Sequence, residues 1–561
     1  MKGQPEALEA GVGDDKNKGL AEVKAQSFFE KYGSCRWIIA YLTCMARLSQ
    51  TALRQFIGMS VVCMQSGNTS FVGNVTLNGT NFAANNLTNF KFQIAEFDWN
   101  SEFEGLILTS YTIGFIFTPV VGGYLAGKFG SKKVIAMSVF VGSLATLLTP
   151  IAARWNADAM VGLRIVVGFF MGTVDPAIQG LWAKWAPKYE KSQLTTTSFS
   201  GVAIAGILTF FISGFLCDID LDNGWPFTFY VFGGYAFFVL VPWIFTVYDT
   251  PDSHPRISDK ERSIIYSGNS SSQMKKMPNP PWRKIFTSLP FWSIIIAHIS
   301  YSWVTSWVMA YLPTYMKEVL DYDIEENGML ASMPFVGRFI SGLLCGFASD
   351  WLLQRHLFST ATVRKIFQFT GNFVCAACTI TIGFLDKEQR TIAVVLLIVG
   401  LSFQNFTSVA FRINHLDIAP RYASVLMGIT MTCAFAAALS APLITAAIVK
   451  EHTREEWQIV FFLVAGLNIV GGLVFVVFAK GEEQEWAKVT PEKDPNAELS
   501  EKPPIDSQFT KDSSKYGNGN INKGYHGDTE SEISETESEL GRRENCDLSE
   551  KRNGHVNNTR L

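Results

Sequence analysis

The sequence predicts an all-α membrane protein in which twelve membrane-spanning helices form two halves of six. Composition is the first indication, because 48% of the residues are hydrophobic and only 17% are charged, whereas soluble proteins carry about 25% charged residues. The second is segment length, since about 20 apolar residues cross the roughly 30 Å hydrocarbon layer of a bilayer. The third is an internal repeat, which relates the two halves.

A pass along the chain finds the apolar segments on both sides of a polar stretch rich in Ser, Pro and Lys. The segments cover residues 37–63, 104–127, 133–153, 157–181, 194–217, 226–248, 291–316, 327–349, 366–385, 391–413, 424–449 and 457–479. The predicted organisation is a cytosolic N-terminal segment (1–36), a first half (37–248), a cytosolic central loop (249–290), a second half (291–480) and a cytosolic tail (481–561). The tail lacks hydrophobic periodicity and is expected to be disordered.

Basic residues predict the orientation of the chain. If residue 1 is cytosolic, far more Lys and Arg fall in cytosolic loops than in luminal loops, as the positive-inside rule requires. The long loop 65–103 is then luminal. It supports this orientation independently, because it contains four predicted N-glycosylation sites. These sites are Asn68, Asn74, Asn78 and Asn86.

The two halves repeat short motifs at equivalent places. Ala186-Pro187-Lys188-Tyr189 follows the fourth segment, and Ala419-Pro420-Arg421-Tyr422 follows the tenth. Two parallel six-helix repeats predict the major facilitator architecture, with a substrate site near the bilayer midplane between them. Nothing in the sequence predicts an enzyme, a cofactor or a metal site. The pair Cys375 and Cys378 lies in an apolar segment and is interpreted as packing residues.

The fourth segment contains charged residues, which are rare inside membrane helices. Arg164, Gly168, Met171 and Asp175 fall on one stripe of an ideal helix. A charge at the bilayer centre costs roughly 2.5–3.5 kcal/mol, so the stripe should face a watery cavity or a charged partner. Two interpretations are open: a polar pathway for substrate, or a structural ion pair between helices.

A matched pair of arginines predicts where an anion binds. Arg54 in the first segment and Arg164 in the fourth lie at similar depth below the luminal surface. Arg stays charged and can hold a carboxylate or phosphate with two parallel hydrogen bonds. We therefore predict substrate contact at Arg54 and Arg164. Arg47 lies on the same face as Arg54, and either Arg47 or one of the pair could instead neutralise Asp175.

The seventh segment interleaves polar and aromatic residues with aliphatic ones. Tyr301 and Trp303 are predicted to contact substrate, and His298 to respond to protons, since imidazole titrates near neutral pH. A His in an apolar segment is also often a packing residue.

Several motifs resemble the anion–cation symporter family, whose members include vesicular glutamate transporters, sialin and type I sodium–phosphate cotransporters. The run Ile413 to Ile429, INHLDIAPRYASVLMGI, resembles the tenth-span signature of that family, and Trp182 to Pro187 resembles its W-x-x-W-A-P motif. The resemblance covers residues 35–485 and implies the major facilitator fold and anion recognition by Arg54 and Arg164. It also shows departures. Met171 stands where the family usually has Glu, and Tyr301 matches the sialin-like state.

The resemblance and the arginines together predict a secondary active transporter of small organic anions, of the glutamate or sialate type. A vesicular or lysosomal membrane is favoured, with possible coupling to H⁺, Na⁺ or Cl⁻. The alternatives are a sodium-coupled phosphate- or urate-type transporter at the plasma membrane and a transport-inactive scaffold. Because Met171 cannot titrate, Asp175 is the first candidate for proton coupling and His298 the second. Expected partners are the anionic substrate, the bilayer and cytosolic proteins that bind the tail, but not nucleic acid.

Overall fold

The computed structural model describes residues 27–65, 96–97, 99, 101–217, 219, 221–266, 277, 279–322, 324–451 and 453–488. The predicted glycosylation sites at Asn68, Asn74, Asn78 and Asn86, most of the N-terminal segment and nearly all of the tail lie outside these residues.

Each of the six segments predicted in the first half is helical. The helices are α3 (Cys35–Gln65), α4 (Ser101–Phe115), α5 (Thr118–Phe129), α6 (Ser131–Trp155), α7 (Ala157–Met171), α8 (Val174–Trp185), α9 (Lys191–Cys217) and α10 (Trp225–Thr246). The second segment divides at Ile116 and Phe117, just before Pro119 in the first turn of α5. The fourth divides at Gly172 and Thr173, so the expectation of one regular helix through Arg164 and Asp175 is wrong. Pro176 lacks the N–H of a helix interior and is tolerated in the first turn of α8.

The second half repeats this arrangement. Its helices are α13 (Leu289–Glu318), α14 (Ile324–Gln354), α15 (Thr360–Ile382), α16 (Arg390–Gln404), α17 (Phe411–Ile418), α18 (Ala423–Ala438), α19 (Ser440–Ile448) and α20 (Arg454–Phe478). Within the described residues, ten helical stretches are long and apolar enough to span a membrane. The helices α3 and α15 complete the twelve predicted segments. Both carry basic residues within otherwise apolar sequences.

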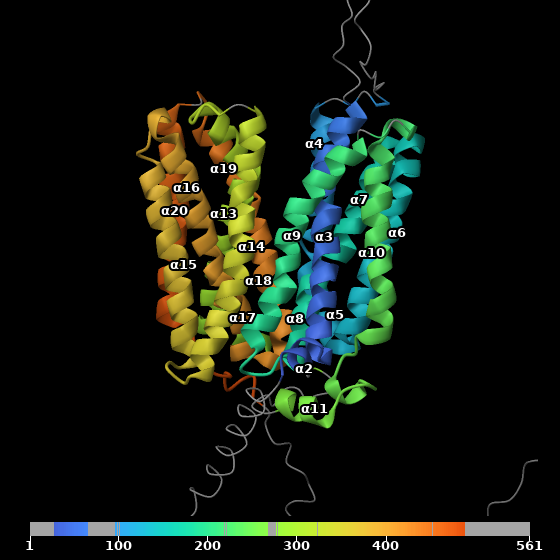
Figure 1. Ribbon diagram of the computed structural model, residues 1–561, viewed down its shortest axis with the longest axis vertical. Coiled ribbons are helices and arrows are strands. Elements are labelled where there is room, and N and C mark those ends of the chain that lie inside the picture. Colours follow the sequence, from blue (N-terminus) through green and yellow to red (C-terminus); the bar gives the residue numbers. More distant parts are fainter. Residues whose placement is uncertain are drawn as a thin grey trace, which may run out of the picture. The chain divides into compact units, whose positions relative to one another are not determined.

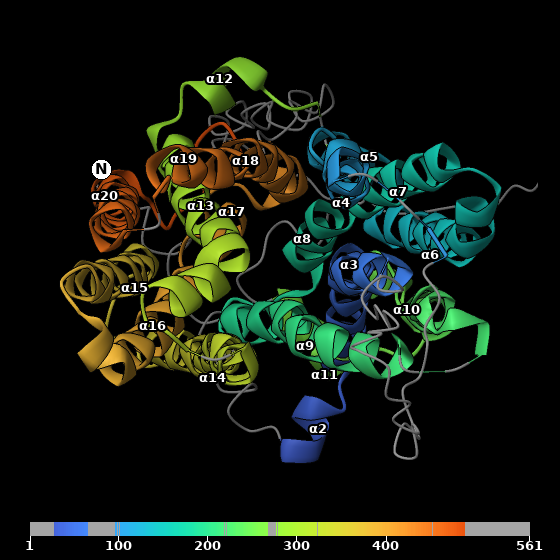
Figure 2. The same ribbon diagram turned by 90° about the horizontal axis from the view of Figure 1, so that it is seen from above.

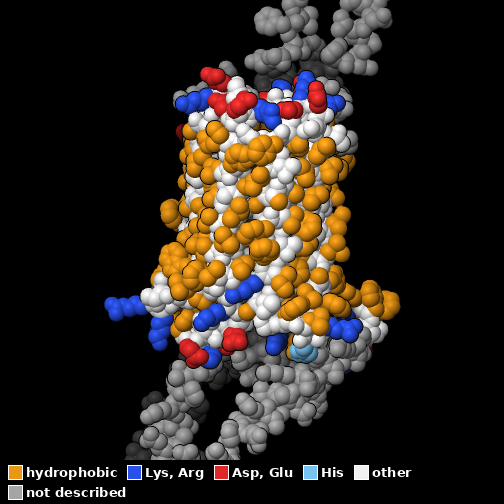
Figure 3. Space-filling view, turned by 90° about the vertical axis from the view of Figure 1, so that its left-hand side faces the viewer, with side chains coloured by type: hydrophobic (Ala, Val, Ile, Leu, Met, Phe, Trp, Pro, Cys, Tyr) orange, Lys and Arg blue, Asp and Glu red, His pale blue; other side chains and the backbone are white. Residues whose placement is uncertain are grey.

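The outer surface has the distribution of side chains that a lipid environment requires. Figure 3 shows hydrophobic side chains over the middle of the visible face, with charged side chains gathered at its two ends. Many large apolar residues of the membrane-spanning helices are exposed, among them Phe211 and Phe215 of α9 and Phe238 of α10. In lipid this exposure carries no hydrophobic penalty, because hydrocarbon tails are as apolar as these side chains.

The two halves converge at one end, which we call the closed end (Figure 1). The ammonium of Lys191 in α9 lies 3.0 Å from the carboxylate of Asp417 in α17. The backbone N–H of Gln193 donates to Asp350 of α14 at 2.7 Å. The amide of Gln354 donates to the carbonyl of Tyr189 at 3.0 Å. These contacts join the first half to the second.

Close backbone approach accompanies the polar contacts at the closed end. A Cβ atom added to Gly428 of α18 would lie 2.3 Å from the carbonyl oxygen of Pro119 in α5. One added to Gly123 of α5 would lie 2.2 Å from the carbonyl oxygen of Ser424. Two helices from opposite halves therefore touch through glycines, and any larger side chain would separate them.

Cys63 at the end of α3 and Cys217 at the end of α9 form a disulfide at the opposite end of the halves. Sequence analysis did not predict this bond. Its place agrees with the predicted luminal side, since disulfides persist in oxidising compartments. At the closed end, Arg36 of α3 pairs with Glu190 at 2.6 Å and with Glu261 of α11 (Asp259–Tyr266) at 3.2 Å. These pairs hold part of the central connection against the first half.

Candidate functional site

A cavity of about 520 Å³ lies between the two halves. The first half lines it with residues of α3, α4, α8 and α9, and the second half with residues of α13, α14, α17 and α18. Figure 2, a view from above, shows these two groups of helices facing each other. The lining is mostly apolar with a few charged groups, as is usual for sites that take small molecules. This is the place where the parallel repeat predicts a substrate site.

Arg54 lines the cavity from α3 and its side chain is exposed to that space. Its guanidinium lies 5.2 Å from the ring centre of Phe435, which belongs to α18 in the other half. The contact is a cation–π interaction and leaves the hydrogen-bonding edge of the guanidinium available. Among the described residues, Arg54 forms no ion pair.

Arg164 occupies a different position from the one that sequence analysis predicted. Its side chain is 1% exposed and is not part of the cavity lining. It donates to the carbonyl of Leu53 at 2.8 Å and lies 5.6 Å from the rings of both Phe56 and Tyr111. Arg164 therefore packs behind the wall that carries Arg54. Direct substrate contact by Arg164 stays a prediction, and it requires a conformation other than this one.

Asp175 lines the cavity and already has a partner. Its carboxylate lies 3.0 Å from the guanidinium of Arg47, and that guanidinium also stacks on Phe199 at 3.3 Å. The ion pair is the second of the two interpretations that the sequence left open. Met171, where the family usually has Glu, is 0% exposed and its carbonyl accepts from Gln50 at 2.8 Å. It contributes no side chain to the cavity.

Helix α13 presents one face to the cavity and the other to the packed core. His298 and Tyr301 line the cavity. The ring of His298 lies within hydrogen-bonding distance of the hydroxyl of Thr430, at 3.2 Å. Trp303 is 4% exposed and donates its indole N–H to Ser440 at 3.2 Å, away from the lining. Side chains two positions apart on an α-helix point about 200° away from each other, so Tyr301 and Trp303 cannot share a face.

Sequence analysis assigned no role to Arg338 of α14 and Arg412 of α17, yet both line the cavity. The guanidinium of Arg412 lies 4.6 Å from the ring of Tyr301 and 4.5 Å from that of Phe199. The guanidinium of Arg338 lies 5.7 Å from the centre of the same Tyr301 ring. The sequence did contain a sign that both residues could be functional. Each is a charged residue inside an apolar segment, and such a residue is a functional candidate by default.

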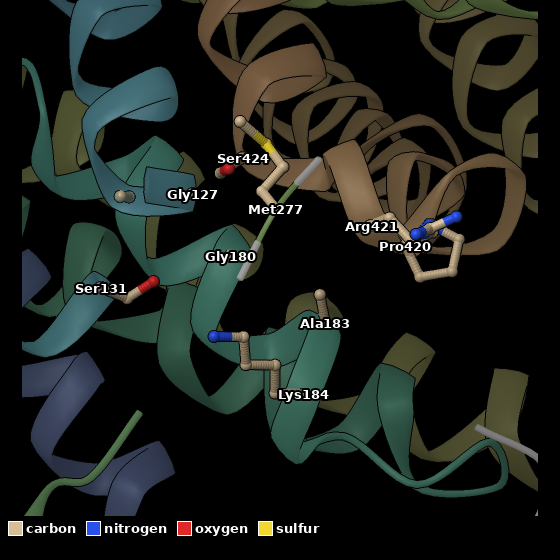
Figure 4. Close-up of a pocket in the computed structure, with 10 residues that line it drawn as sticks. Gly127, Ser131, Gly180, Ala183, Lys184, Met277, Pro420, Arg421 and Ser424 are labelled. Carbon is tan, nitrogen blue, oxygen red and sulfur yellow. The ribbon is translucent and has the colours of Figure 1, made fainter. Parts of the chain in front are cut away.

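A second pocket lies at the closed end between α5, α8 and the start of α18 (Figure 4). Lys184, Ser131 and Arg421 surround it, but its volume is about 30 Å³. That is room for about one water molecule. We therefore interpret it as a seam between the halves and not as a site for an organic anion.

Two six-helix halves around a central cavity define a transporter of the major facilitator type. The family model described as Major Facilitator Superfamily matches residues 56–442. Solved structures of low sequence identity show the same fold. The proton:xylose symporter XylE has a TM-score of 0.58 and is 14% identical. The match covers 79% of this chain and 97% of the XylE chain. FucP in the outward conformation has a TM-score of 0.54 and is 11% identical, covering 78% and 99%.

Closer relatives identify the branch of the superfamily. Sialin from Homo sapiens is 36% identical over 460 residues, which are 81% of this chain and 91% of sialin. Vesicular glutamate transporter 3 from Danio rerio is 34% identical over 457 residues, 81% of this chain and 74% of the relative. The chain belongs to the family of sialin and the vesicular glutamate transporters, as the resemblance of its motifs predicted. It is a multi-pass membrane protein whose relatives are transporters.

Proposed function

We propose that the chain is a secondary transporter of small organic anions, the broad class to which the glutamate named in several of its relatives belongs. The observation that carries this proposal is the charge of the cavity. Arg54, Arg338 and Arg412 line it, while Asp175, the acidic residue of the lining, is paired with Arg47. A cavity with excess positive charge concentrates anions and raises their rate of association.

Transport would proceed by alternating access, in which the two halves rock around the cavity. In this structure the polar contacts of Lys191 with Asp417 and of Gln193 with Asp350 hold one end shut. The positive-inside rule places that end in the cytosol, with both termini, and places loop 65–103 in the lumen. The names of the vesicular glutamate transporters favour a vesicular membrane, and a lysosomal membrane is the other location that we propose. A potential that is positive inside the vesicle would then favour anion uptake by roughly 2.3 kcal/mol per charge per 100 mV.

Uptake by the purified full-length protein in proteoliposomes tests this function. Labelled organic anions should accumulate inside, and accumulation should increase when a potassium gradient with valinomycin makes the interior positive. Protein-free liposomes under the same gradient provide the control. The proposal is wrong if none of a panel of mono- and dicarboxylates accumulates above that control in protein shown to be folded by size-exclusion chromatography.

For proton coupling we propose Asp175 first and His298 second, because both line the cavity and can change charge. The charged and titratable groups around them are Arg47 and Tyr111 near Asp175, and Arg412, His415 and Tyr301 near His298. Uptake by Asp175→Asn, measured with the external and internal pH varied separately, should lose the pH response of the unmodified protein. A retained profile would make Asp175 only the structural partner of Arg47. If the unmodified protein has no pH response, potential, Na⁺ or Cl⁻ drives transport instead.

A further inference from the structure

We propose that the transported anion carries two acidic groups and no ammonium group, so that it is a short dianion. One acidic group would bind at Arg54 and the other between Arg338 and Arg412. This inference rests on the proposed function, which it makes more specific. It separates this chain from carriers of amino acids and of monocarboxylates.

The cavity contains two separate cationic positions, one in each half. Arg54 projects from α3 of the first half. Arg338 from α14 and Arg412 from α17 belong to the second half, and both lie over the ring of Tyr301, at 5.7 Å and 4.6 Å. Both guanidinium groups of the second half therefore lie close to one tyrosine ring. A ligand with an acidic group at each end would contact both halves at once.

The protein only partly satisfies the hydrogen-bonding groups of the guanidiniums of the second half. Arg338 donates to the side-chain oxygen of Gln404 through Nη2, while its Nε has no hydrogen-bond partner and is buried. The buried Nε of Arg412 also has no partner. Buried polar groups are normally satisfied, and each donor left unpaired costs about 1–3 kcal/mol. Carboxylate or phosphate oxygens are the acceptors that best match a guanidinium group.

Charge balance favours two negative charges on the ligand. Among the described residues, neither Arg54, Arg338 nor Arg412 forms an ion pair with a carboxylate. A monoanion would leave most of this positive charge uncompensated in a cavity from which the closing halves exclude water. Opposite charges attract more strongly as the effective dielectric constant falls, so occlusion increases the preference for the second negative charge.

The groups close to the three arginines are poorly suited to an ammonium group. The carboxylate of Asp175 is occupied by Arg47 at 3.0 Å. Aromatic faces are the other common site for a cation, and three of the rings in the lining already contact guanidinium groups. Phe435 contacts Arg54, and Phe199 and Tyr301 contact Arg412. An ammonium group close to these arginines would be repelled by their charge, which lowers affinity for amino acids.

Three five-carbon acids test the proposal on the unmodified protein. Glutarate has two carboxylates, glutamate adds one ammonium to the same chain, and pentanoate has a single carboxylate. Their binding to the purified full-length protein is measured by thermal shift. In addition, each acid is tested as an inhibitor of the uptake of a labelled organic anion. Glutarate should bind about 10-fold or more tightly than either of the others, since one charged hydrogen-bonded group contributes about 1.5–3 kcal/mol. Equal binding of glutamate or of pentanoate would overturn the proposal.

Variants locate the second acidic group. Arg338→Gln and Arg412→Gln should each weaken glutarate binding about 10-fold and pentanoate binding less than about 3-fold, because only glutarate reaches both positions. Arg355→Gln, an exposed arginine outside the cavity lining, is the matched control and should resemble the unmodified protein. Equal losses for both acids in the cavity variants would contradict a second subsite. Because the comparison of ligands in the unmodified protein needs no variant, a variant that fails to fold leaves the proposal testable.

A small inorganic anion could fill the second position in place of a second acidic group. Each titration is therefore made in chloride and in gluconate. If chloride raises the affinity for pentanoate to that for glutarate, the site takes a monoanion together with chloride and the dianion proposal is wrong. If pentanoate and glutamate are transported as well as glutarate, anion transport stands while the dianion inference fails. If none of the three acids binds, and no other anion accumulates, the proposed function itself fails.

Discussion

Anion uptake should fall about 100-fold when Arg54 is replaced by Ala, because the variant loses its charged hydrogen bonds, each contributing about 1.5–3 kcal/mol. Arg54 is exposed to the cavity and has no carboxylate partner among the described residues, so its charge is available to substrate. Arg54→Lys should recover little activity, since an ammonium group lacks the planar pair of donors. Initial rates of uptake in proteoliposomes, over a range of substrate concentrations, measure the effect.

Arg164→Ala is the informative comparison, because both arginines were predicted from the same pattern. Arg164 is buried and bonded to the carbonyl of Leu53, so its loss should lower the thermal stability of the protein in detergent. Full uptake by Arg164→Ala would remove it from the substrate site and leave Arg54 in place. Full uptake by Arg54→Ala, in contrast, would show that Arg54 does not bind the transported anion, and would leave Arg338 and Arg412 as the cationic groups of the cavity.

The helices were predictable because membrane solvation constrains sequence directly. Every backbone polar group within lipid must be bonded internally, so a long apolar segment can only be a helix in a chain of this composition. The segment around α20 illustrates this, since Arg454–Phe478 needed no tertiary information to be recognised. The same physics predicted the central location of the site, because a parallel repeat brings equivalent surfaces of the two halves together.

The identity of the side chains that line the site was less predictable. The depth of a residue in the membrane does not determine whether its side chain points into the cavity or into the protein interior. Arg54 and Arg164 were matched by depth, yet one faces the cavity and the other the protein interior. Rotation of a helix about its axis depends on its neighbours, which hydropathy does not describe. The break at Gly172 and Thr173 adds to the problem, since it interrupts the periodicity that related Arg164 to Asp175.

Contacts between residues that are far apart in the chain were the other feature that could not be predicted from the sequence. Cys63 and Cys217 are 154 residues apart, and no spacing rule connects them. Arg338 and Arg412 reach one tyrosine from two helices, a relation that exists only after the second half has folded. The interpretation of Asp175 as a helix-bracing partner was stated as an alternative. The structure provides the partner, Arg47, but the effect of pH on uptake decides whether the pair also opens during transport.

Transport should stop when Gly428 is replaced by Leu, although the protein should still fold. An added Cβ at this position would lie 2.3 Å from the carbonyl oxygen of Pro119, and backbone cannot retreat as a flexible side chain can. The two halves could then not meet at the closed end, and alternating access requires that each end shut in turn. Gly466→Leu is the matched control, because an added Cβ there meets no atom within 4 Å.

Two measurements on the same protein distinguish blocked closure from misfolding. Uptake should be lost in Gly428→Leu and retained in Gly466→Leu, with both variants eluting as the unmodified protein does in size-exclusion chromatography. A cysteine placed at Ser424, whose carbonyl oxygen faces Gly123 across the seam, should react faster with a membrane-impermeant maleimide in Gly428→Leu. The closed end would then be held apart. Normal uptake in Gly428→Leu would mean that the halves need not approach as closely as they do here, and that the contacts of Lys191 with Asp417 and of Gln193 with Asp350 are sufficient to shut this end.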